Sequence, residues 1–219
     1  MTARPIGVVD VVYASTPGAI ERSRLAAADG FAHIDCMVGD DPASLALPVG
    51  CPTSFPKPVA CWCSTPAPAR DALATVPGAD AGMWDRAVRW WQRAQGALLE
   101  PWAGAVVCSV ETWLAFLDEV PGTRLLVDTG HVADWGGDPL ELLEWAGHVQ
   151  LRQGCRGSTQ LHVDDVRGAV DFAAVFARLD ALGYDGEVSV EYFDLPDQGW
   201  ALDDPRSWAV DLAAHLRTL

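Results

Sequence analysis

The sequence contains few basic residues. Of its 219 residues, 15 are Lys or Arg and 30 are Asp or Glu, which gives a formal net charge of −15 at pH 7. The basic residues do not gather into a cluster along the chain. Because a strongly acidic surface repels a phosphate backbone, we expect no nucleic-acid partner.

Long apolar runs are also missing. No run approaches the roughly 20 residues that cross a bilayer, and no separate apolar core follows the N-terminus as it would in a signal peptide. We therefore expect a cytoplasmic protein without a membrane partner. The six cysteines do not form the two CxxC pairs of a zinc site, so we interpret most of them as small buried hydrophobes.

Short apolar runs alternate with amphipathic stretches along the chain. Hydrophobic residues make up 50% of the sequence and charged residues 21%, which is typical of a globular protein. We expect strands over residues 6–13, 31–36, 45–49, 59–63, 97–100, 125–128, 148–152 and 188–191. We expect helices over residues 19–29, 69–74, 83–95, 110–120, 138–147, 171–182 and 206–219, and a long polar loop over residues 153–170.

This alternation of strands with helices predicts a parallel sheet. Eight strands favour a compact (β/α)8 TIM barrel, with shortened or missing helices in its N-terminal half and a single domain over residues 1–219. An open doubly wound sheet is the alternative. It is disfavoured because neither of the usual nucleotide-binding loops, GxGxxG or GxxxxGK[ST], follows the first strand.

The late strands each end in an oxygen-bearing side chain. These side chains are Glu100, Asp128, Gln150 and Glu191. In a barrel the carboxyl ends of the strands meet at one rim, where three carboxylates would repel one another without a cation between them. Such an oxygen-rich set of ligands suits Mn²⁺ or Mg²⁺, with Zn²⁺ or Co²⁺ as alternatives.

Four segments of the chain resemble those of a known family. They are residues 97–100, the Val-Asp-Thr-Gly-His run over residues 127–131, the His-Val-Gln run within residues 147–150, and the Gly-Tyr-Asp-Gly…Glu run within residues 182–191. Together they are similar to the xylose isomerase-like barrel superfamily of sugar (phosphate) isomerases and epimerases, and within it to the hydroxypyruvate isomerase-like branch.

The resemblance implies a divalent-metal-dependent isomerase or epimerase. Glu100, Asp128, Gln150 and Glu191 would be the metal ligands. Glu100 and Glu191 would also be the catalytic acid and base, facing each other across the substrate. The substrate would be a small sugar or hydroxy-keto compound that reacts through an enediolate.

The resemblance, read with the neighbouring residues, also suggests substrate contacts. His131 would bind a substrate oxygen, and Arg156 would bind a carboxylate or phosphate group unless it is a solvated loop residue. Trp102 would help to exclude water from the pocket. His33 and Asp35 share one face of a strand, either as contacts at the rim or as a hydrogen-bonded pair inside the barrel.

Two positions depart from the family pattern. Pro101-Trp102 follows the first Glu where many members have Asn-His, and Arg152-Gln153 stands where Lys-Asp is common. Two alternatives therefore stay open: a metal-dependent lyase, dehydratase or hydrolase acting on a polyol-derived metabolite, and a non-catalytic barrel. The oligomeric state is also open, with a homodimer as one alternative.

Overall fold

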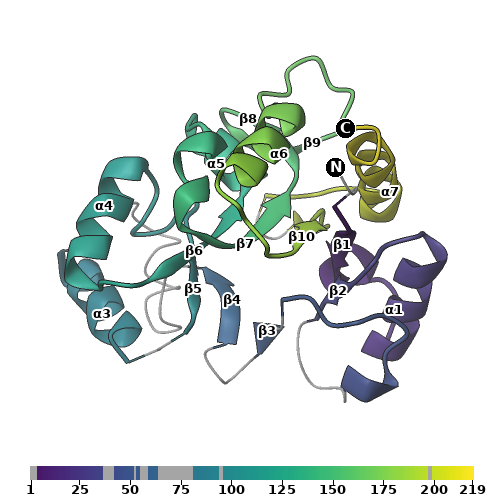
Figure 1. Ribbon diagram of the computed structural model, residues 1–219, viewed down its shortest axis with the longest axis horizontal. Coiled ribbons are helices and arrows are strands. Elements are labelled where there is room, and N and C mark those ends of the chain that lie inside the picture. The colour runs from purple at the N-terminus through teal and green to yellow at the C-terminus, as the bar shows by residue number, and fades with distance from the viewer. Residues whose placement is uncertain are drawn as a thin grey trace.

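A computed structural model describes most of the chain (Figure 1). The described residues are 4–36, 42–51, 53–54, 59–63, 81–93, 96–196 and 199–219. The helix that we expected over residues 69–74 lies outside them. None of the described helices is long and apolar enough to cross a membrane.

The parallel strands follow one another in sequence order around the molecule. They are β1 (Ile6–Val9), β2 (Ile34–Asp35), β4 (Val59–Cys63), β5 (Leu98–Glu100), β6 (Arg124–Asp128), β7 (Ala146–Leu151) and β10 (Val188–Val190). The short strand β3 (Thr53–Ser54) pairs antiparallel with β4, and the sheet order is β2-β1-β10-β7-β6-β5-β4-β3.

Pairing between the first and last of these parallel strands distinguishes a barrel from an open sheet. Ile6 of β1 lies beside Val188 of β10, and an isolated parallel bridge joins Ile34 of β2 to Val49. A doubly wound sheet would instead run outward from a central first strand. The observed order is that of a (β/α)8 barrel, in which the predicted strand over residues 45–49 is reduced to the bridge at Val49.

Helices pack around the outside of this sheet. They are α1 (Ala19–Ala28), α3 (Ala81–Trp91), α4 (Val110–Glu119), α5 (Thr129–Trp135), α6 (Phe172–Ala181) and α7 (Pro205–Leu216). In Figure 1, α3 and α4 lie on one side of the strands and α1 and α7 on the other. The described residues between β2 and Val49 contain only a 3-10 turn, Pro42–Ser44, which agrees with the predicted loss of a helix in the N-terminal half.

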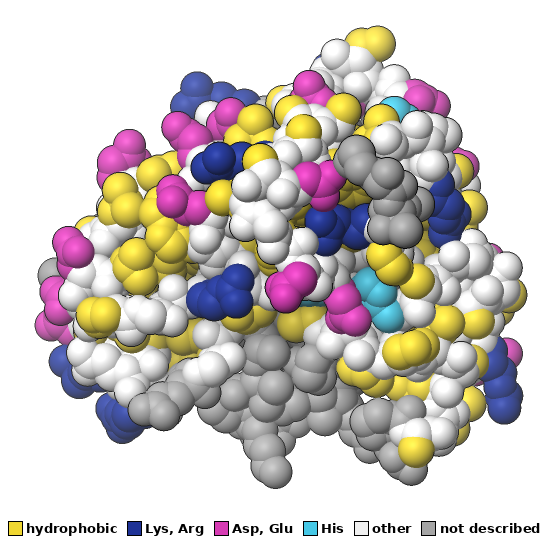
Figure 2. All heavy atoms as spheres, viewed as in Figure 1, with side chains coloured by type: hydrophobic (Ala, Val, Ile, Leu, Met, Phe, Trp, Pro, Cys, Tyr) yellow, Lys and Arg dark blue, Asp and Glu magenta, His cyan; other side chains and the backbone are white. Residues whose placement is uncertain are grey.

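Local sequence explains where these helices start and what they bury. Ser109 caps α4 in a reciprocal capping box with Thr112, and the helix buries Trp113 and Phe116, whose rings pack edge-on against Trp145 and Trp84. Asp171 caps α6 by accepting a hydrogen bond from the backbone N–H of Ala174. Acidic and basic side chains are interspersed on the face seen in Figure 2, as expected for an acidic chain without a basic cluster.

The prediction of a helix over residues 138–147 was wrong. Two short 3-10 helices, Pro139–Glu141 and Leu143–Trp145, occupy this segment, and β7 already begins at Ala146. The helix after β6 is α5, which begins directly behind Asp128 and ends before Gly136, whose φ is 83°. Asp138 does cap the first of these 3-10 helices, by accepting a hydrogen bond from the backbone N–H of Leu140, but only a few residues remain before the next strand.

Three smaller expectations also need correction. The first strand ends at Val9, and Asp10–Tyr13 forms a 3-10 helix. The loop over residues 153–170 contains a hairpin of β8 (Gln153–Cys155) and β9 (Ser158–Leu161), which turns at Gly157 with a φ of 81°. Cys51 is buried as expected, but it is disulfide-bonded.

Polar side chains form a buried layer that links the first strands of the barrel to the last. Nε2 of His33 lies 3.1 Å from Oγ of Ser189, and Nε2 of His148 lies 2.7 Å from a carboxylate oxygen of Asp35. A Cβ atom on Gly7 would fall 2.0 Å from the His33 ring, so only glycine leaves room for that ring. His33 and Asp35 thus lie inside the barrel, but each is hydrogen-bonded to a residue of another strand and the two do not form the predicted pair with each other.

Candidate active site

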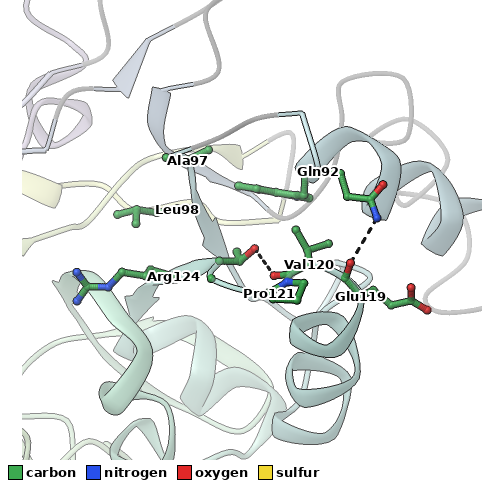
Figure 3. Close-up of a pocket in the computed structure, with 11 residues that line it drawn as sticks. Gln92, Ala97, Leu98, Glu119, Val120, Pro121 and Arg124 are labelled. Atoms are coloured by element: carbon green, nitrogen blue, oxygen red, sulfur yellow. Dashed lines mark hydrogen bonds between the residues drawn. The ribbon is translucent and has the colours of Figure 1, made fainter.

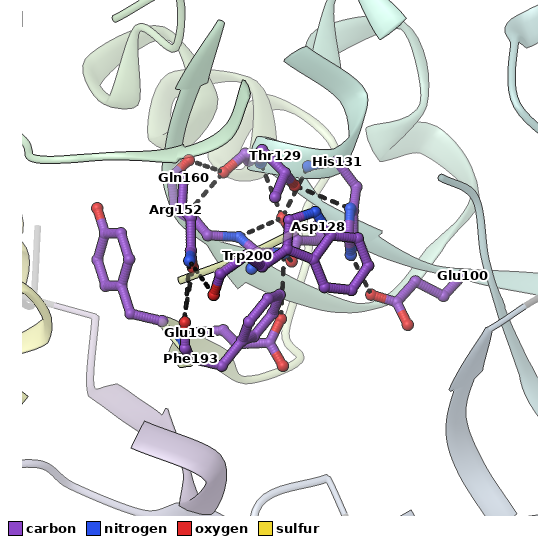
Figure 4. A network of polar contacts seen from close by, with 12 residues as sticks. Glu100, Asp128, Thr129, His131, Arg152, Gln160, Glu191, Phe193 and Trp200 are labelled. Carbon is purple, nitrogen blue, oxygen red and sulfur yellow. Dashed lines mark hydrogen bonds and ion pairs between the residues drawn. The ribbon is translucent and has the colours of Figure 1, made fainter. Parts of the chain in front are cut away.

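Five polar side chains meet at the carboxyl ends of the late strands (Figure 4). Glu100 ends β5, Asp128 ends β6, Arg152 and Glu191 directly follow β7 and β10, and His131 lies in the first turn of α5. They form one connected series, in which each contacts the next. Glu100 and Glu191 stand at its two ends, and Asp128 lies in the middle.

Asp128 is fully buried and has every neighbour that an ionised carboxylate needs. Its Oδ1 accepts hydrogen bonds from the backbone N–H groups of Gly130 (2.7 Å) and His131 (3.1 Å). Through these two bonds Asp128 caps the N-terminus of α5. Its Oδ2 pairs with Nη2 of Arg152. Burial acts to raise the pKa of Asp128, but the Arg152 guanidinium and these hydrogen bonds outweigh it and hold the pKa below its usual range.

The two glutamates keep partial access to solvent. Their side chains are 15% (Glu100) and 13% (Glu191) exposed, whereas the side chains of Asp128 and Arg152 are not exposed at all. Burial and the nearby Asp128 charge raise the pKa of Glu100 to about 8. Burial, with Asp128 and Glu100, also raises the pKa of Glu191 well above its usual range, although Arg152 opposes the shift. Without a further cation, both carboxyls therefore tend to hold a proton.

His131 joins Glu100 to the wall of the site. Its Nε2 lies 3.7 Å from Oε1 of Glu100, and its Nδ1 lies 2.9 Å from Oγ1 of Thr159. Burial lowers the pKa of His131 to about 3, so the imidazole is neutral. The rings of Trp102 and Trp200 lie 6.2 and 5.6 Å from the His131 ring and cover it from two directions.

The charges and donor atoms of the site fit a divalent cation. Glu100, Asp128 and His131 offer ligand atoms that all lie within 4.8 Å of one another. Three carboxylates and one guanidinium leave two negative charges uncompensated if all are ionised, and this deficit adds to the effect of burial, which is the main cause of the raised pKa of both glutamates. One divalent ion would supply the missing charge, so this cluster is a candidate metal site.

Gln150, the fourth predicted ligand, lies beside this cluster. It is 3% exposed and pairs in register with Asp128 on one side and Ser189 on the other. Because side chains alternate along a strand, Gln150 shares its face of β7 with His148 and with Arg152, the residue that follows the strand. The predicted ligands Glu100, Asp128, Gln150 and Glu191 are thus all near the carboxyl ends of neighbouring strands.

Arg156, the arginine that we selected from the sequence, lies apart from the carboxylates. It is exposed at the turn of the β8–β9 hairpin, where a Cβ atom on Gly136 would be 3.2 Å from its Nε. The guanidinium in the site belongs to Arg152, whose place among the carboxylates we did not predict. A signal was available, because residues 148, 150 and 152 alternate on one strand face and Arg152 stands where the family often has Lys.

A separate cavity of about 580 Å³ opens at the other end of the strands (Figure 3). It lies between α3, the end of α4 and the starts of β5 and β6, and its lining includes Gln92, Leu98, Glu119 and Arg124. In barrels of this kind the chemistry occurs at the carboxyl ends of the strands, whereas Leu98 and Arg124 begin theirs. This cavity is therefore not the candidate active site.

In protein freed of divalent ions, the stability of the fold should fall as the pH rises. The Glu100 carboxyl has a pKa near 4.5 in the unfolded chain and about 8 in the folded protein. Its protonation therefore contributes fully to the stability of the fold below about pH 4.5, and this contribution is lost as the pH rises through about 8. We expect the Tm of EDTA-treated protein to fall by several degrees between about pH 5 and about pH 9, and less in a Glu100→Gln variant. A thermal melting series checks this; a variant as pH-sensitive as the wild type would remove Glu100 from the explanation.

Comparison with known proteins identifies the family. Residues 81–219, more than half of the chain, match the family model of the xylose isomerase-like TIM barrel. The chain therefore belongs to this family. Membership confirms the predicted fold and, at the level of the family, the prediction of an isomerase-like enzyme.

Solved structures share the fold at low sequence identity. A structure of L-ribulose 3-epimerase has a TM-score of 0.67 at 19% identity, over 97% of this chain and 93% of that chain. D-allulose 3-epimerase from Methylomonas sp., in complex with D-allulose, has a TM-score of 0.65 at 19% identity, over 99% and 97% of the two chains. A probable 3-DHS dehydratase from Bacillus anthracis has a TM-score of 0.62 at 10% identity, over 96% and 98%. No curated protein matches the chain.

Proposed function

We propose that the protein is a divalent-cation-dependent isomerase or epimerase of a small sugar or hydroxy-keto compound. The observation that carries this proposal is the arrangement of Glu100 and Glu191. They stand at opposite ends of one buried polar series, and both keep a little solvent access. Both also have a raised pKa, which suits groups that exchange protons near neutral pH.

The two glutamates would act as acid and base. One carboxylate removes the proton from the carbon next to the substrate carbonyl, and the other carboxyl delivers a proton. Delivery to the opposite face of the same carbon inverts that centre. Delivery to the neighbouring carbon, with transfer of the hydroxyl proton to the former carbonyl oxygen, converts an aldose to a ketose. Their placement at the ends of two separate strands, with Glu100 ending β5 and Glu191 directly after β10, supports access to the substrate from two sides.

Other residues would stabilise and enclose the reacting atoms. The neutral imidazole of His131 is available to hydrogen-bond a substrate oxygen, because its Nδ1 is already paired with Thr159. Trp102 and Trp200 cover this side of the site and help to exclude water from a basic intermediate. A divalent cation bound by Glu100, Asp128, Gln150 and Glu191 would supply electrophilic stabilisation of the negative charge that develops on the substrate oxygen.

Solvent isotope exchange tests the proposal. The protein with Mn²⁺ is incubated in D2O with short ketoses and hydroxy-keto acids, and deuterium at the carbon next to the carbonyl is measured by NMR. We expect exchange with at least one compound, and its loss in EDTA. Exchange accompanied by loss of water from the substrate would favour a dehydratase. Absence of exchange across the panel would contradict the proposal and favour a non-catalytic barrel.

A further inference from the structure

Arg152 is a fully buried arginine whose charge is directed at two carboxylates. Its Nη2 pairs with Oδ2 of Asp128 and lies 3.4 Å from Oε2 of Glu191, and its Nε lies 3.4 Å from Oδ1 of Asp128. Nη1 is buried and has no hydrogen-bond partner among the described residues. The positive charge is therefore shared between the two carboxylates.

The surrounding chain is shaped to hold this guanidinium. The Phe193 ring centre lies 4.4 Å from the guanidinium carbon and covers one face of it. The backbone N–H of Arg152 donates to Oγ1 of Thr129 (2.9 Å), and that hydroxyl donates to the backbone carbonyl of Arg152 (2.8 Å). A Cβ atom on Gly130 would lie 2.8 Å from Nε of Arg152, so the glycine of the Asp-Thr-Gly-His run leaves space for this side chain.

Burial of a charge at this depth is costly unless its partners are fixed, which indicates a specific use. The planar fork of a guanidinium can contact two carboxylates at once, whereas a lysine ammonium is a point charge on a flexible stem. Here Nε and Nη2 both reach Asp128 at the end of β6, and the same Nη2 also reaches Glu191 after β10, although β7 lies between these strands. Arg152 thus connects two of the four predicted ligands.

We propose that Arg152 is a positioning residue that holds Asp128 and Glu191 in place for a divalent cation, and that it supplies the resident positive charge of the cluster. The part that concerns the cation rests on the proposed function. The resident charge is the positive charge of the Arg152 guanidinium, which stabilises the carboxylates in the metal-free protein as well. Arg152 itself need not contact the substrate.

Cation affinity tests the positioning role. Arg152→Lys keeps the charge but removes the fork, and Arg178→Lys on the exposed face of α6 is the matched control. We expect calorimetric titration with Mn²⁺ to show affinity weakened roughly 10–100-fold by Arg152→Lys, the range found when a partner of a metal ligand is lost, and unchanged by Arg178→Lys. An affinity equal to or tighter than that of the wild type would overturn this role, because Arg152 would then only repel the ion.

Thermal melting in EDTA tests the resident charge separately. Arg152→Met leaves the buried carboxylates without their counter-ion, and we expect its Tm to fall by about 10 °C, against no change for Arg178→Met. Excess Mn²⁺ should add less to the Tm of Arg152→Met than to that of the wild type, because a more weakly bound ion stabilises the fold less. Equal melting of the two variants in EDTA would overturn the proposal. If Arg152→Met does not accumulate as folded protein, Arg152→Lys takes its place, with a smaller expected loss.

The two experiments also separate this proposal from the proposed function. A wild-type protein that binds no Mn²⁺ would contradict the proposed cation dependence and, with it, the positioning role. The melting comparison in EDTA would still decide whether Arg152 stabilises the carboxylates. Loss of isotope exchange with normal Mn²⁺ binding would contradict the proposed reaction alone.

Discussion

Replacement of Glu100 or Glu191 by glutamine should reduce isotope exchange by about 10²–10⁴-fold, the usual contribution of a general acid or base. An amide has nearly the shape of a protonated carboxyl but cannot accept a proton from carbon. Since both carboxyls tend to be protonated in the metal-free protein, each variant should keep the fold.

The measurement is deuterium incorporation by NMR, with circular dichroism as the check on folding. Glu144→Gln is the matched control, because Glu144 is exposed on a 3-10 helix outside the site. Exchange at the wild-type rate in either site variant would remove that glutamate from the mechanism. A loss in Glu144→Gln as well would show that the assay reports general damage.

Asp128→Asn should lower the free energy of unfolding by about 3–5 kcal/mol, because it removes one charge of a buried pair and leaves Arg152 without its main partner. It should also weaken Mn²⁺ binding strongly, since the central carboxylate of the cluster loses its charge. Denaturant unfolding measures the first effect and calorimetric titration the second.

Asp138→Asn separates this effect from helix capping. Asp138 also accepts a backbone hydrogen bond at a helix start, from Leu140 at 2.9 Å, but it is an exposed residue. Asparagine caps helices about as well as aspartate, so Asp138→Asn should change the free energy of unfolding by less than about 0.5 kcal/mol. Similar losses in the two variants would mean that the pair with Arg152 contributes little.

Much of the fold was predictable because it depends on neighbours in the chain. Helices α4, α6 and α7 have side-chain caps and buried faces that depend on residues close in the chain, and α1 begins directly after Gly18, so these four helices were predicted close to their observed positions. The alternation of these helices with short apolar strands was sufficient to predict a parallel barrel. Where two signals competed, as between Asp128 and Asp138 for the helix after β6, local patterns selected the wrong segment.

For the site, the sequence by itself determined which side chains stand at the ends of the late strands. A strand buried on both faces can be recognised from its apolar composition. The apolar run before Asp128 therefore marks a strand end, and Glu100 and Glu191 mark two others. The resemblance to a known family then added roles to them. Neither source of information says which side chains touch.

Only the tertiary structure decided the partners. It paired Asp128 with Arg152 instead of bringing Arg156 to the site, placed His33 against Ser189, and brought Trp200 over His131. The contacts of His33 with Ser189 and of Trp200 with His131 join residues that are far apart in the sequence. Asp128 and Arg152 are brought together by the pairing of the neighbouring strands β6 and β7. The physical reason is that strand register and barrel closure set which side chains face one another, and both arise from packing of the whole chain.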